Sequence, residues 1–233
     1  MGLLMETGRI DLNKLPVRED GRTLLQRIYD MKRIPSYPQT QKSRDVEEER
    51  QGLLRLLLEY GMDTSVINAD GSTVVIEALY KDWTEDVKIL LDKGVSVNTR
   101  ENSSYLYRGS AAHRKARGDT LLILAARRNK PKLVELLLLY VSSDNRIDVD
   151  LTGDGGMTAF MWAAFNNNIE IMNMLMPYAS VNMRSEEGYT ALLFAIDRLS
   201  SEAMYLLIRN SYVNLDLAHN VSEYWIKARL GRA

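Results

Sequence analysis

A basic stretch near the middle of the chain holds the side chains best suited to binding chemistry. Residues 99–117 read TRENSSYLYRGSAAHRKAR, in which five basic residues face one acidic residue, Glu101, and two tyrosines are interleaved. Guanidinium groups pair with carboxylates and phosphates, and aromatic rings can stack on bases. The stretch is interpreted as a plain solvated loop, as a contact for an acidic protein partner or, least favoured, as a nucleic-acid contact. Its basic residues are Arg100, Arg108, Arg114, Lys115 and Arg117, which with Glu101 give a local charge of +4.

No arrangement of residues in the sequence points to catalysis, a cofactor or a metal ion. The chain lacks a phosphate-binding glycine loop, a G-x-S-x-G elbow and paired metal-ligand histidines. Residues 148–154 start like a calcium loop, but Ala159 stands at the twelfth position, where a bidentate glutamate is needed. We interpret them as an acidic turn, and His113 and His219 as surface residues. The prediction is a protein that is not an enzyme and holds no cofactor.

Composition excludes several classes of protein. No apolar run approaches the roughly 18 residues that a membrane span requires, and the net charge of −1 gives the whole molecule no attraction for nucleic acid or anionic lipid. The apolar fraction of 45% and the charged fraction of 26% are typical of a globular protein. The absence of cysteine removes disulfides and thiol chemistry and favours the cytoplasm, with an exported or host-delivered protein as the alternative. We expect a monomer.

An internal repeat indicates the elements that must position these residues. Gly156 and Gly188 lie 32 residues apart, and a marker threonine recurs in step with them. A period in the low thirties is typical of stacked helix pairs, so the longer first three intervals predict insertions of roughly 17, 14 and 5 residues within them. The markers are Thr23, Thr73, Thr120, Thr158 and Thr190, followed by Ser222, and their intervals are 50, 47, 38, 32 and 32 residues.

Each repeat is predicted to hold a short helix, capped by the marker threonine, and a longer helix with a buried leucine stripe. Residues 32–45 contain two prolines and no periodic apolar face, and are predicted to form a loop. Gly61 and Gly94 are predicted to end long helices and Pro131 to begin one. The helices expected in the first three repeats include Val46–Tyr60, Val74–Lys81, Glu85–Lys93 and Leu121–Arg128.

The chain is predicted to form a single all-α domain over residues 1–233. Residues 1–20 look like the end of a preceding repeat, which suggests that the chain is part of a longer protein. A cap helix is expected within residues 219–233. The repeats are expected at residues 20–69, 70–116, 117–154, 155–186 and 187–218.

These repeats resemble the ankyrin-repeat family, whose signature is D-G-x-T-P-L-H-x-A-A followed by a helix that ends L-L-L-x-x-G-A-D-V-N. The resemblance runs from about residue 7 to residue 230, apart from the insertions, and implies a helical solenoid. The proline and histidine of the signature are replaced throughout. Because that histidine links neighbouring turns in the family, we expect this stack to depend more on apolar packing. The matches are Asp70-Gly71 with Thr73, Leu90-Leu91 with Gly94, Val97-Asn98, Gly118 with Thr120 and Ala125-Ala126, Gly156 with Thr158 and Ala163-Ala164, and Gly188 with Thr190-Ala191-Leu192.

The resemblance implies a protein-interaction module that binds its partner along a concave face. Exposed aromatic residues beside arginines are typical of interface hot spots, whereas Trp162, among alanines, is assigned to the core. The alternatives are a solvated face with incidental rings, and a regulatory or substrate-docking domain of a longer enzyme or effector. Carried over by register, the face includes Tyr80, Lys81, Asp119, Arg127, Arg128, Met157, Phe165, Asn166, Tyr189 and Arg198, and the basic insertion would add Arg108, Arg114 and Lys115 as attraction for an acidic partner.

Overall fold

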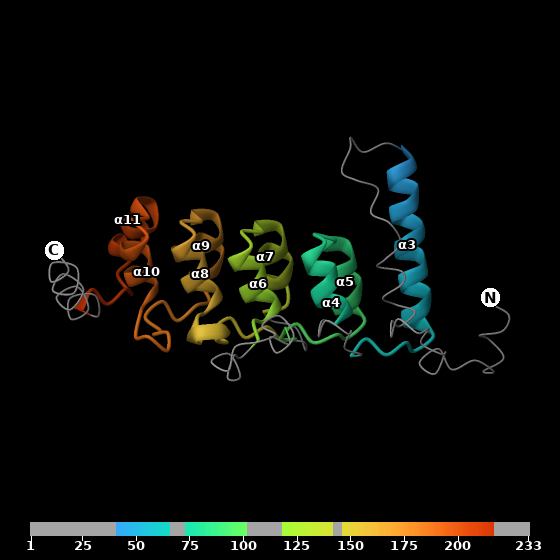
Figure 1. The fold of residues 1–233 in the computed structure, drawn as a ribbon, viewed down its shortest axis with the longest axis horizontal. Helices are drawn as coiled ribbons and strands as arrows, with labels where there is room; N and C mark the ends of the chain where they lie inside the picture. Colours follow the sequence, from blue (N-terminus) through green and yellow to red (C-terminus); the bar gives the residue numbers. More distant parts are fainter. Residues whose placement is uncertain (1–40, 66–72, 102–117, 142–145, 217–233) are drawn as a thin grey trace, which may run out of the picture. The chain divides into compact units, whose positions relative to one another are not determined.

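A computed structural model of the chain describes residues 41–65, 73–101, 118–141 and 146–216 (Figure 1). Within these ranges the chain forms α-helices, one short 3₁₀ helix and one isolated β-bridge, and no β-strand. The all-α fold class predicted from the sequence is therefore confirmed. The chain divides into two compact units, the second of which takes over at Val97, and each is described by itself.

The first unit contains helices α3 (Gln41–Glu59), α4 (Val74–Tyr80) and α5 (Thr84–Asp92). Helix α3 begins at Gln41, so the prediction that residues 41–45 belong to a loop is wrong. These residues read QKSRD, without glycine or proline, and most of them favour helix, so nothing stops the helix from extending to Gln41. Gly61 and Gly94 have φ angles of +73° and +92°, which confirms that left-handed glycines follow α3 and α5.

A buried ion pair joins α3 to α5 in the first unit. The guanidinium of Arg50 pairs with the carboxylate of Asp86, and the two side chains are 6% and 0% exposed. The same guanidinium lies 3.7 Å from the centre of the Trp83 ring. The sequence pattern did not predict this contact, because a single arginine on a long polar helix is typical of a solvated face.

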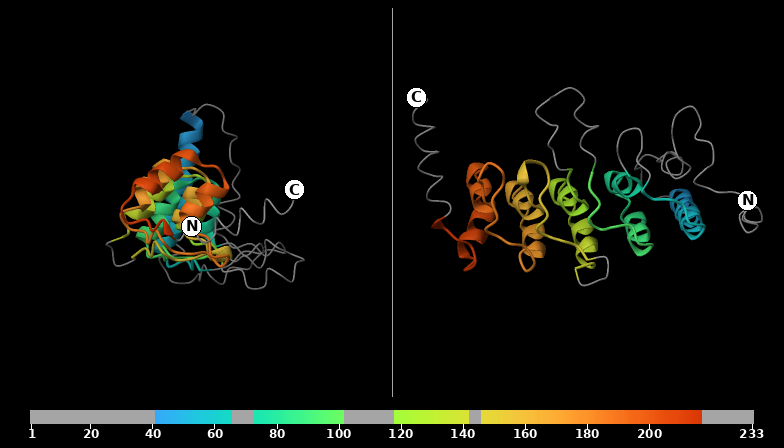
Figure 2. Two further views of the ribbon diagram at one scale, coloured as in Figure 1. Left: turned by 90° about the vertical axis from the view of Figure 1, so that its left-hand side faces the viewer. Right: turned by 90° about the horizontal axis from the view of Figure 1, so that it is seen from below.

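The second unit is built from the helix pairs α6 (Leu121–Arg127) with α7 (Pro131–Leu138), α8 (Ala159–Phe165) with α9 (Ile169–Leu175), and α10 (Ala191–Asp197) with α11 (Ser201–Arg209). Figure 2 shows the pairs side by side. The short helices α6, α8 and α10 pack in series, and so do the longer partners α7, α9 and α11. The 3₁₀ helix η3 (Asp154–Gly156) lies in the turn before α8. A stack of two-helix repeats was the prediction, and these pairs follow it.

Small and branched apolar side chains form the core of this unit. Every residue of α6 from Leu121 to Ala126 is at most 1% exposed, and Ala163, Ala164 and Ala195 are fully buried. Alanines at the contacts let neighbouring short helices approach closely, while the leucines of the longer helices fill the space behind them. Pro131 occupies the first turn of α7, as expected.

The marker threonines begin the short helices. Thr120, Thr158 and Thr190 each accept a hydrogen bond at Oγ1 from a backbone N–H of the first turn, at 3.2–3.3 Å. Thr73 does not, and its Oγ1 is buried without a hydrogen-bond partner, so its predicted role as a side-chain cap is wrong. Helix α4 still begins there, because the Thr73 carbonyl accepts a bond from the N–H of Glu77 at 3.0 Å.

The reversal after each short helix uses a residue with a left-handed backbone. Asp82, Asn129, Asn167 and Leu199 have φ angles between +54° and +60°, and each lies nine residues after a marker threonine. Aspartate and asparagine tolerate this conformation, whereas leucine is strained in it. The Leu199 side chain is also 77% exposed, so burial does not compensate for the strain.

Replacing Leu199 with asparagine is therefore expected to stabilise the protein by about 1 kcal/mol. Urea unfolding monitored by circular dichroism measures the difference. Leu199→Ala is the matched control, because it removes the same exposed side chain but lacks the polar group with which asparagine hydrogen-bonds locally in the left-handed conformation. Equal stabilities of the two variants would contradict the explanation by strain.

Side chains of asparagine and aspartate link successive turns of the second unit. Asn98 Nδ2 donates to the carbonyl of Arg146 at 2.9 Å, while its Oδ1 accepts from the Asp148 N–H at 3.1 Å. Asn182 repeats the arrangement with the carbonyl of Tyr212 and the N–H of Asn214, both at 2.7 Å. The stack thus has hydrogen-bonded links between turns despite the missing histidine, in addition to the apolar packing that the sequence predicts. Both asparagines belong to the Val-Asn pair at the end of a repeat, Val97-Asn98 and Val181-Asn182.

Candidate functional site

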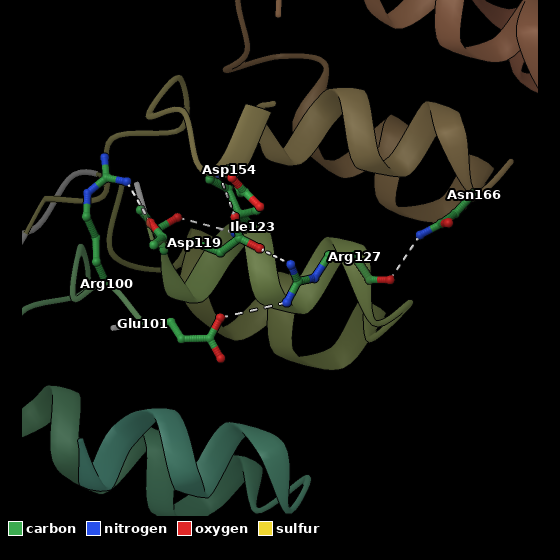
Figure 3. Close-up of polar contacts among 9 residues, drawn as sticks. Arg100, Glu101, Asp119, Ile123, Arg127, Asp154 and Asn166 are labelled. Atoms are coloured by element: carbon green, nitrogen blue, oxygen red, sulfur yellow. Dashed lines mark hydrogen bonds and ion pairs between the residues drawn. The ribbon is translucent and has the colours of Figure 1, made fainter. Parts of the chain in front are cut away.

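Arg127 lies between two buried carboxylates of the second unit. Its Nη1 is 2.5 Å from Asp119 Oδ2, and its Nη2 is 3.8 Å from Glu101 Oε2 (Figure 3). The side chains of Asp119 and Glu101 are 1% and 6% exposed, and that of Arg127 is 28% exposed. One guanidinium therefore serves both carboxylates, which we call the carboxylate pair. The other oxygen of Glu101, Oε1, is buried and has no hydrogen-bond partner.

Two backbone segments, residues 100–101 at the start of the basic insertion and residues 118–120 after it, hold the carboxylate pair in place. The N–H of Glu101 donates to the carbonyl of Asp119 at 2.8 Å, and Arg100 and Thr120 form an antiparallel bridge. Arg100 Nη1 adds a hydrogen bond to the carbonyl of Gly118 at 2.9 Å. Because the segments lie against one another, the first and last residues beside the insertion are fixed by the fold.

The turn that precedes α8 is hydrogen-bonded to Arg100 and Asp119. Arg100 Nη1 also donates to the carbonyl of Thr152 at 2.8 Å, and the N–H of Asp154 donates to Asp119 Oδ1 at 3.1 Å (Figure 3). Asp119 thus accepts a backbone hydrogen bond on one oxygen and forms an ion pair with Arg127 through the other. Its position in the repeat signature places it in a turn, but its role is to connect two turns and a helix.

The environment raises the pKa of both members of the carboxylate pair. Burial away from water is the largest cause for each, because it disfavours the charged form. The positive charge of Arg127 acts in the opposite direction on both carboxyls, and the N–H of Asp154 also favours ionised Asp119. The charge of Asp119 adds to the increase at Glu101. The ionised carboxylate of Glu101 is therefore a burden on the folded state at neutral pH.

Replacing Glu101 with glutamine should raise the free energy of unfolding at pH 7.5. When the pKa of a carboxyl is higher in the folded state, ionisation of that carboxyl lowers the stability of the protein. This loss of stability is present above the folded pKa and disappears as the pH falls below the folded pKa. The gain from Glu101→Gln should accordingly shrink as the pH is lowered from 7.5 to 4.5. Urea titrations of both proteins across that range measure it. A variant less stable than the parent at pH 7.5 would show that the ion pair with Arg127 outweighs burial.

Four aromatic rings lie in a row beside Arg127 and the carboxylate pair. Trp162 and Phe165 on α8 meet edge to face, with ring centres 5.4 Å apart, and Phe165 meets Phe194 on α10 in the same way at 6.0 Å. Tyr189, in the turn before α10, lies 5.2 Å from Phe194. Trp162, Phe165 and Tyr189 are partly exposed, whereas Phe194 is 9% exposed. We call these residues the aromatic row.

An arginine lies over a ring at two places along the aromatic row. The guanidinium of Arg198 is 4.3 Å from the centre of the Phe165 ring, and that of Arg127 is 5.8 Å from the Trp162 ring. Asn166 Nδ2 donates to the Arg127 carbonyl at 3.1 Å and so joins α8 to α6 (Figure 3). Cation–π contacts orient the guanidinium groups beside apolar surface. The arrangement can bind another molecule by apolar contact and by hydrogen bonds from arginine.

A comparison with models of protein families gives a match over most of the chain. The model described as "Ankyrin repeats (3 copies)" matches residues 47–148, 102–185 and 122–219. The chain belongs to the ankyrin-repeat family. Ankyrin repeats are generally protein–protein interaction modules and are typically non-catalytic. A search of curated proteins finds no match to this chain.

The ankyrin register places most of the predicted contact residues of the second unit at the surface, with two corrections. Asp119 was predicted to contact a partner, but it is buried and paired with Arg127 and is therefore not available to one. Trp162 is partly exposed and lies in the aromatic row rather than in the closed core. Its spacing of three residues from Phe165 was the signal, since such residues share a helix face. Met157, Phe165 and Tyr189 are partly exposed, and Arg128, Asn166 and Arg198 are exposed.

The remaining predicted contacts lie in the first unit or in the insertion. Tyr80 and Lys81 are partly exposed, and Lys81 Nζ is 3.0 Å from Glu77 Oε1 and 5.0 Å from the Trp83 ring. Arg108, Arg114 and Lys115 lie outside the described residues. None of the helices in the described ranges combines the length and apolar character that crossing a bilayer requires.

The acidic turn at residues 148–154 is occupied by the repeat's own hydrogen bonds. Asp148 Oδ1 accepts from the Asp150 N–H at 3.1 Å, and Asp150 Oδ1 accepts from the Ser180 N–H at 2.8 Å. Asp154 lies in η3, where its N–H bonds to Asp119. The described part of the chain holds no cluster of acidic or histidine side chains that could bind a metal ion.

Proposed function

We propose that this ankyrin-repeat protein recruits a protein partner through the aromatic row of the second unit. The observation that supports this most directly is the set of partly exposed rings with an arginine stacked on one of them. Large amphipathic rings and arginines contribute most of the binding energy at protein interfaces. The rings also lose little conformational freedom on binding, because neighbouring rings already restrict them.

The basic insertion is proposed to assist this binding over longer range. Its residues Arg108, Arg114 and Lys115 belong to a sequence of strong positive charge, and an acidic partner surface would be steered toward it. Such steering is screened by salt, so the association rate should fall as ionic strength rises. Retention of the protein on RNA at low salt would instead favour the nucleic-acid interpretation. The absence of cysteine is compatible with action in the reducing cytoplasm.

Replacing Phe165 or Tyr189 with alanine should weaken partner capture at least about tenfold, since each removes a ring from the centre of the proposed contact. Affinity capture on the immobilised full chain, followed by quantitative mass spectrometry, identifies the partner and measures the loss. Tyr212→Ala is the matched control, because Tyr212 is 81% exposed and lies after α11, outside the row. Circular dichroism melts verify that each variant is folded. Unchanged capture by folded Phe165 and Tyr189 variants would rule out the aromatic row as the binding surface.

An alternative function is docking or regulation within a longer enzyme or effector. It is motivated by residues 1–20, which look like the end of a further repeat. The length of the natural reading frame tests it directly. A catalytic segment in the same frame would make the aromatic row a substrate-docking or regulatory surface rather than the whole function.

A further inference from the structure

The two arginines that lie over rings of the aromatic row, Arg127 and Arg198, differ in whether they form ion pairs. Arg127 forms ion pairs with Glu101 and Asp119, so its charge is already matched by buried carboxylates. Arg198 takes part in none of the ion pairs among the described residues, and its side chain is exposed over the Phe165 ring. The nearest acidic residue in sequence, Asp197, is itself exposed. Arg198 is thus the arginine of the row whose hydrogen-bond donors can serve a partner.

Leu199, the next residue, is strained and exposed where the two preceding repeats hold asparagine. Asn129 and Asn167 occupy the equivalent left-handed position and use it well: Asn129 Oδ1 accepts a bond from Asn168, and Asn167 Oδ1 accepts from the Ala203 N–H at 3.0 Å. Leu199 has no such bond to make, and its side chain is 77% exposed. Ile196, one turn earlier on α10, is also exposed at 39%. A strained, exposed leucine with no structural use points to a contact outside the chain.

We propose that Arg198 and Leu199 together bind a protein segment that carries a carboxylate next to a large apolar side chain. This rests on the proposed function, of which it defines the partner chemistry. A guanidinium presents parallel N–H donors that match a carboxylate, and its stacking on Phe165 holds it in place before binding. Leu199 and Ile196 supply apolar surface for the other half of the motif. The aliphatic or aromatic side chain next to the carboxylate of the segment loses its water there.

The charge state of the row supports a carboxylate rather than a basic ligand. The carboxylate pair is buried and engaged by Arg127, so it offers a basic segment no accessible partner. Exposed carboxylates also lie nearby in the sequence, at Asp197, Glu186 and Glu187, but of these exposed charges it is the guanidinium of Arg198 that is stacked on a ring of the row. Burying a guanidinium without a counter-charge is costly, so a segment that covers Arg198 must bring one.

A displayed library of random twelve-residue peptides, selected on the full chain, tests the proposal. We expect enriched peptides to contain aspartate or glutamate beside leucine, isoleucine or phenylalanine. Synthetic copies of these peptides should bind Arg198→Gln and Leu199→Asn at least tenfold more weakly than the parent. The matched control is Arg209→Gln on α11, where Arg209 donates to the Tyr205 hydroxyl at 2.5 Å, and it should bind normally.

The variant Leu199→Asn separates a binding role from a structural one, because we expect it to be more stable than the parent. Weaker peptide binding by a protein with a higher melting temperature cannot result from unfolding. Three outcomes would each overturn the proposal. The first is enrichment of basic or neutral peptides, and the second is no enrichment at all. The third is that Leu199→Asn and Arg198→Gln bind the peptides as tightly as the parent does. The proposed function fails separately, when Phe165→Ala and Tyr189→Ala leave capture of the protein partner unchanged.

Discussion

Replacing Arg127 with methionine should lower the free energy of unfolding by about 3 kcal/mol at pH 7. Methionine keeps most of the apolar stem but removes the only guanidinium that contacts the carboxylate pair among the described residues. Asp119 and Glu101 would then stay buried without their counter-charge, and a buried uncompensated carboxylate destabilises the folded state strongly. Urea unfolding at pH 7 measures the loss.

The loss should depend on pH. Without Arg127 the pKa of each carboxyl, already raised by burial, rises further, so the carboxyls take up protons more readily in the folded protein. The deficit of Arg127→Met should therefore diminish as the pH falls from 7 to 5. A deficit that is constant with pH would point to lost packing rather than to unpaired charge.

Two further variants define this result. Arg128→Met alters the adjacent exposed arginine on the same helix end, whose charge is the smallest of the causes that act on the pKa of Glu101, and a change within about 0.5 kcal/mol is expected there. The double variant Arg127→Met with Asp119→Asn should recover part of the stability, because the amide leaves one buried charge fewer. Additive losses in the double variant would contradict the ion pair as the cause.

Replacing Gly118 with alanine should destabilise the protein by about 3 kcal/mol. A β-carbon at this position would lie 1.5 Å from the backbone carbonyl oxygen of Glu101, far inside contact distance. The obstacle is backbone, which cannot turn aside as a side chain can. The two segments beside the insertion would have to separate, with loss of the bond from the Glu101 N–H to the Asp119 carbonyl.

Gly52→Ala is the control for the glycine-to-alanine change itself. Gly52 lies inside α3, and a β-carbon there would meet no atom within 4 Å. Alanine should stabilise the helix by about 0.5–1 kcal/mol, since glycine is the more flexible residue in the unfolded chain. Denaturant unfolding of both variants gives the comparison. A Gly118→Ala protein as stable as the parent would mean that the segments are not held together as described.

Local features of the sequence predicted the helices well. The marker threonines of the second unit begin short helices, Gly61 and Gly94 follow α3 and α5 with positive φ, and Pro131 begins α7. Each of these effects depends on residues within one helical turn. The predicted start of α3 was wrong, because the loop expected around the two nearby prolines was extended to include residues 41–45. The left-handed reversal nine residues after each marker was also readable, at least where the residue is asparagine or aspartate.

The sequence by itself determined the repeat, the helix class and the family, because hydrophobic period and turn residues act over short distances. Only the tertiary structure decided which polar side chains face a partner. It brings Glu101 against Asp119 across the insertion, buries both with Arg127, and joins rings from α8 and α10 into one row. Register placed Asp119 on the contact face, and the alanines around Trp162 placed that residue in the core. Burial and pairing depend on which segments pack together in space, and sequence spacing carries little of that information.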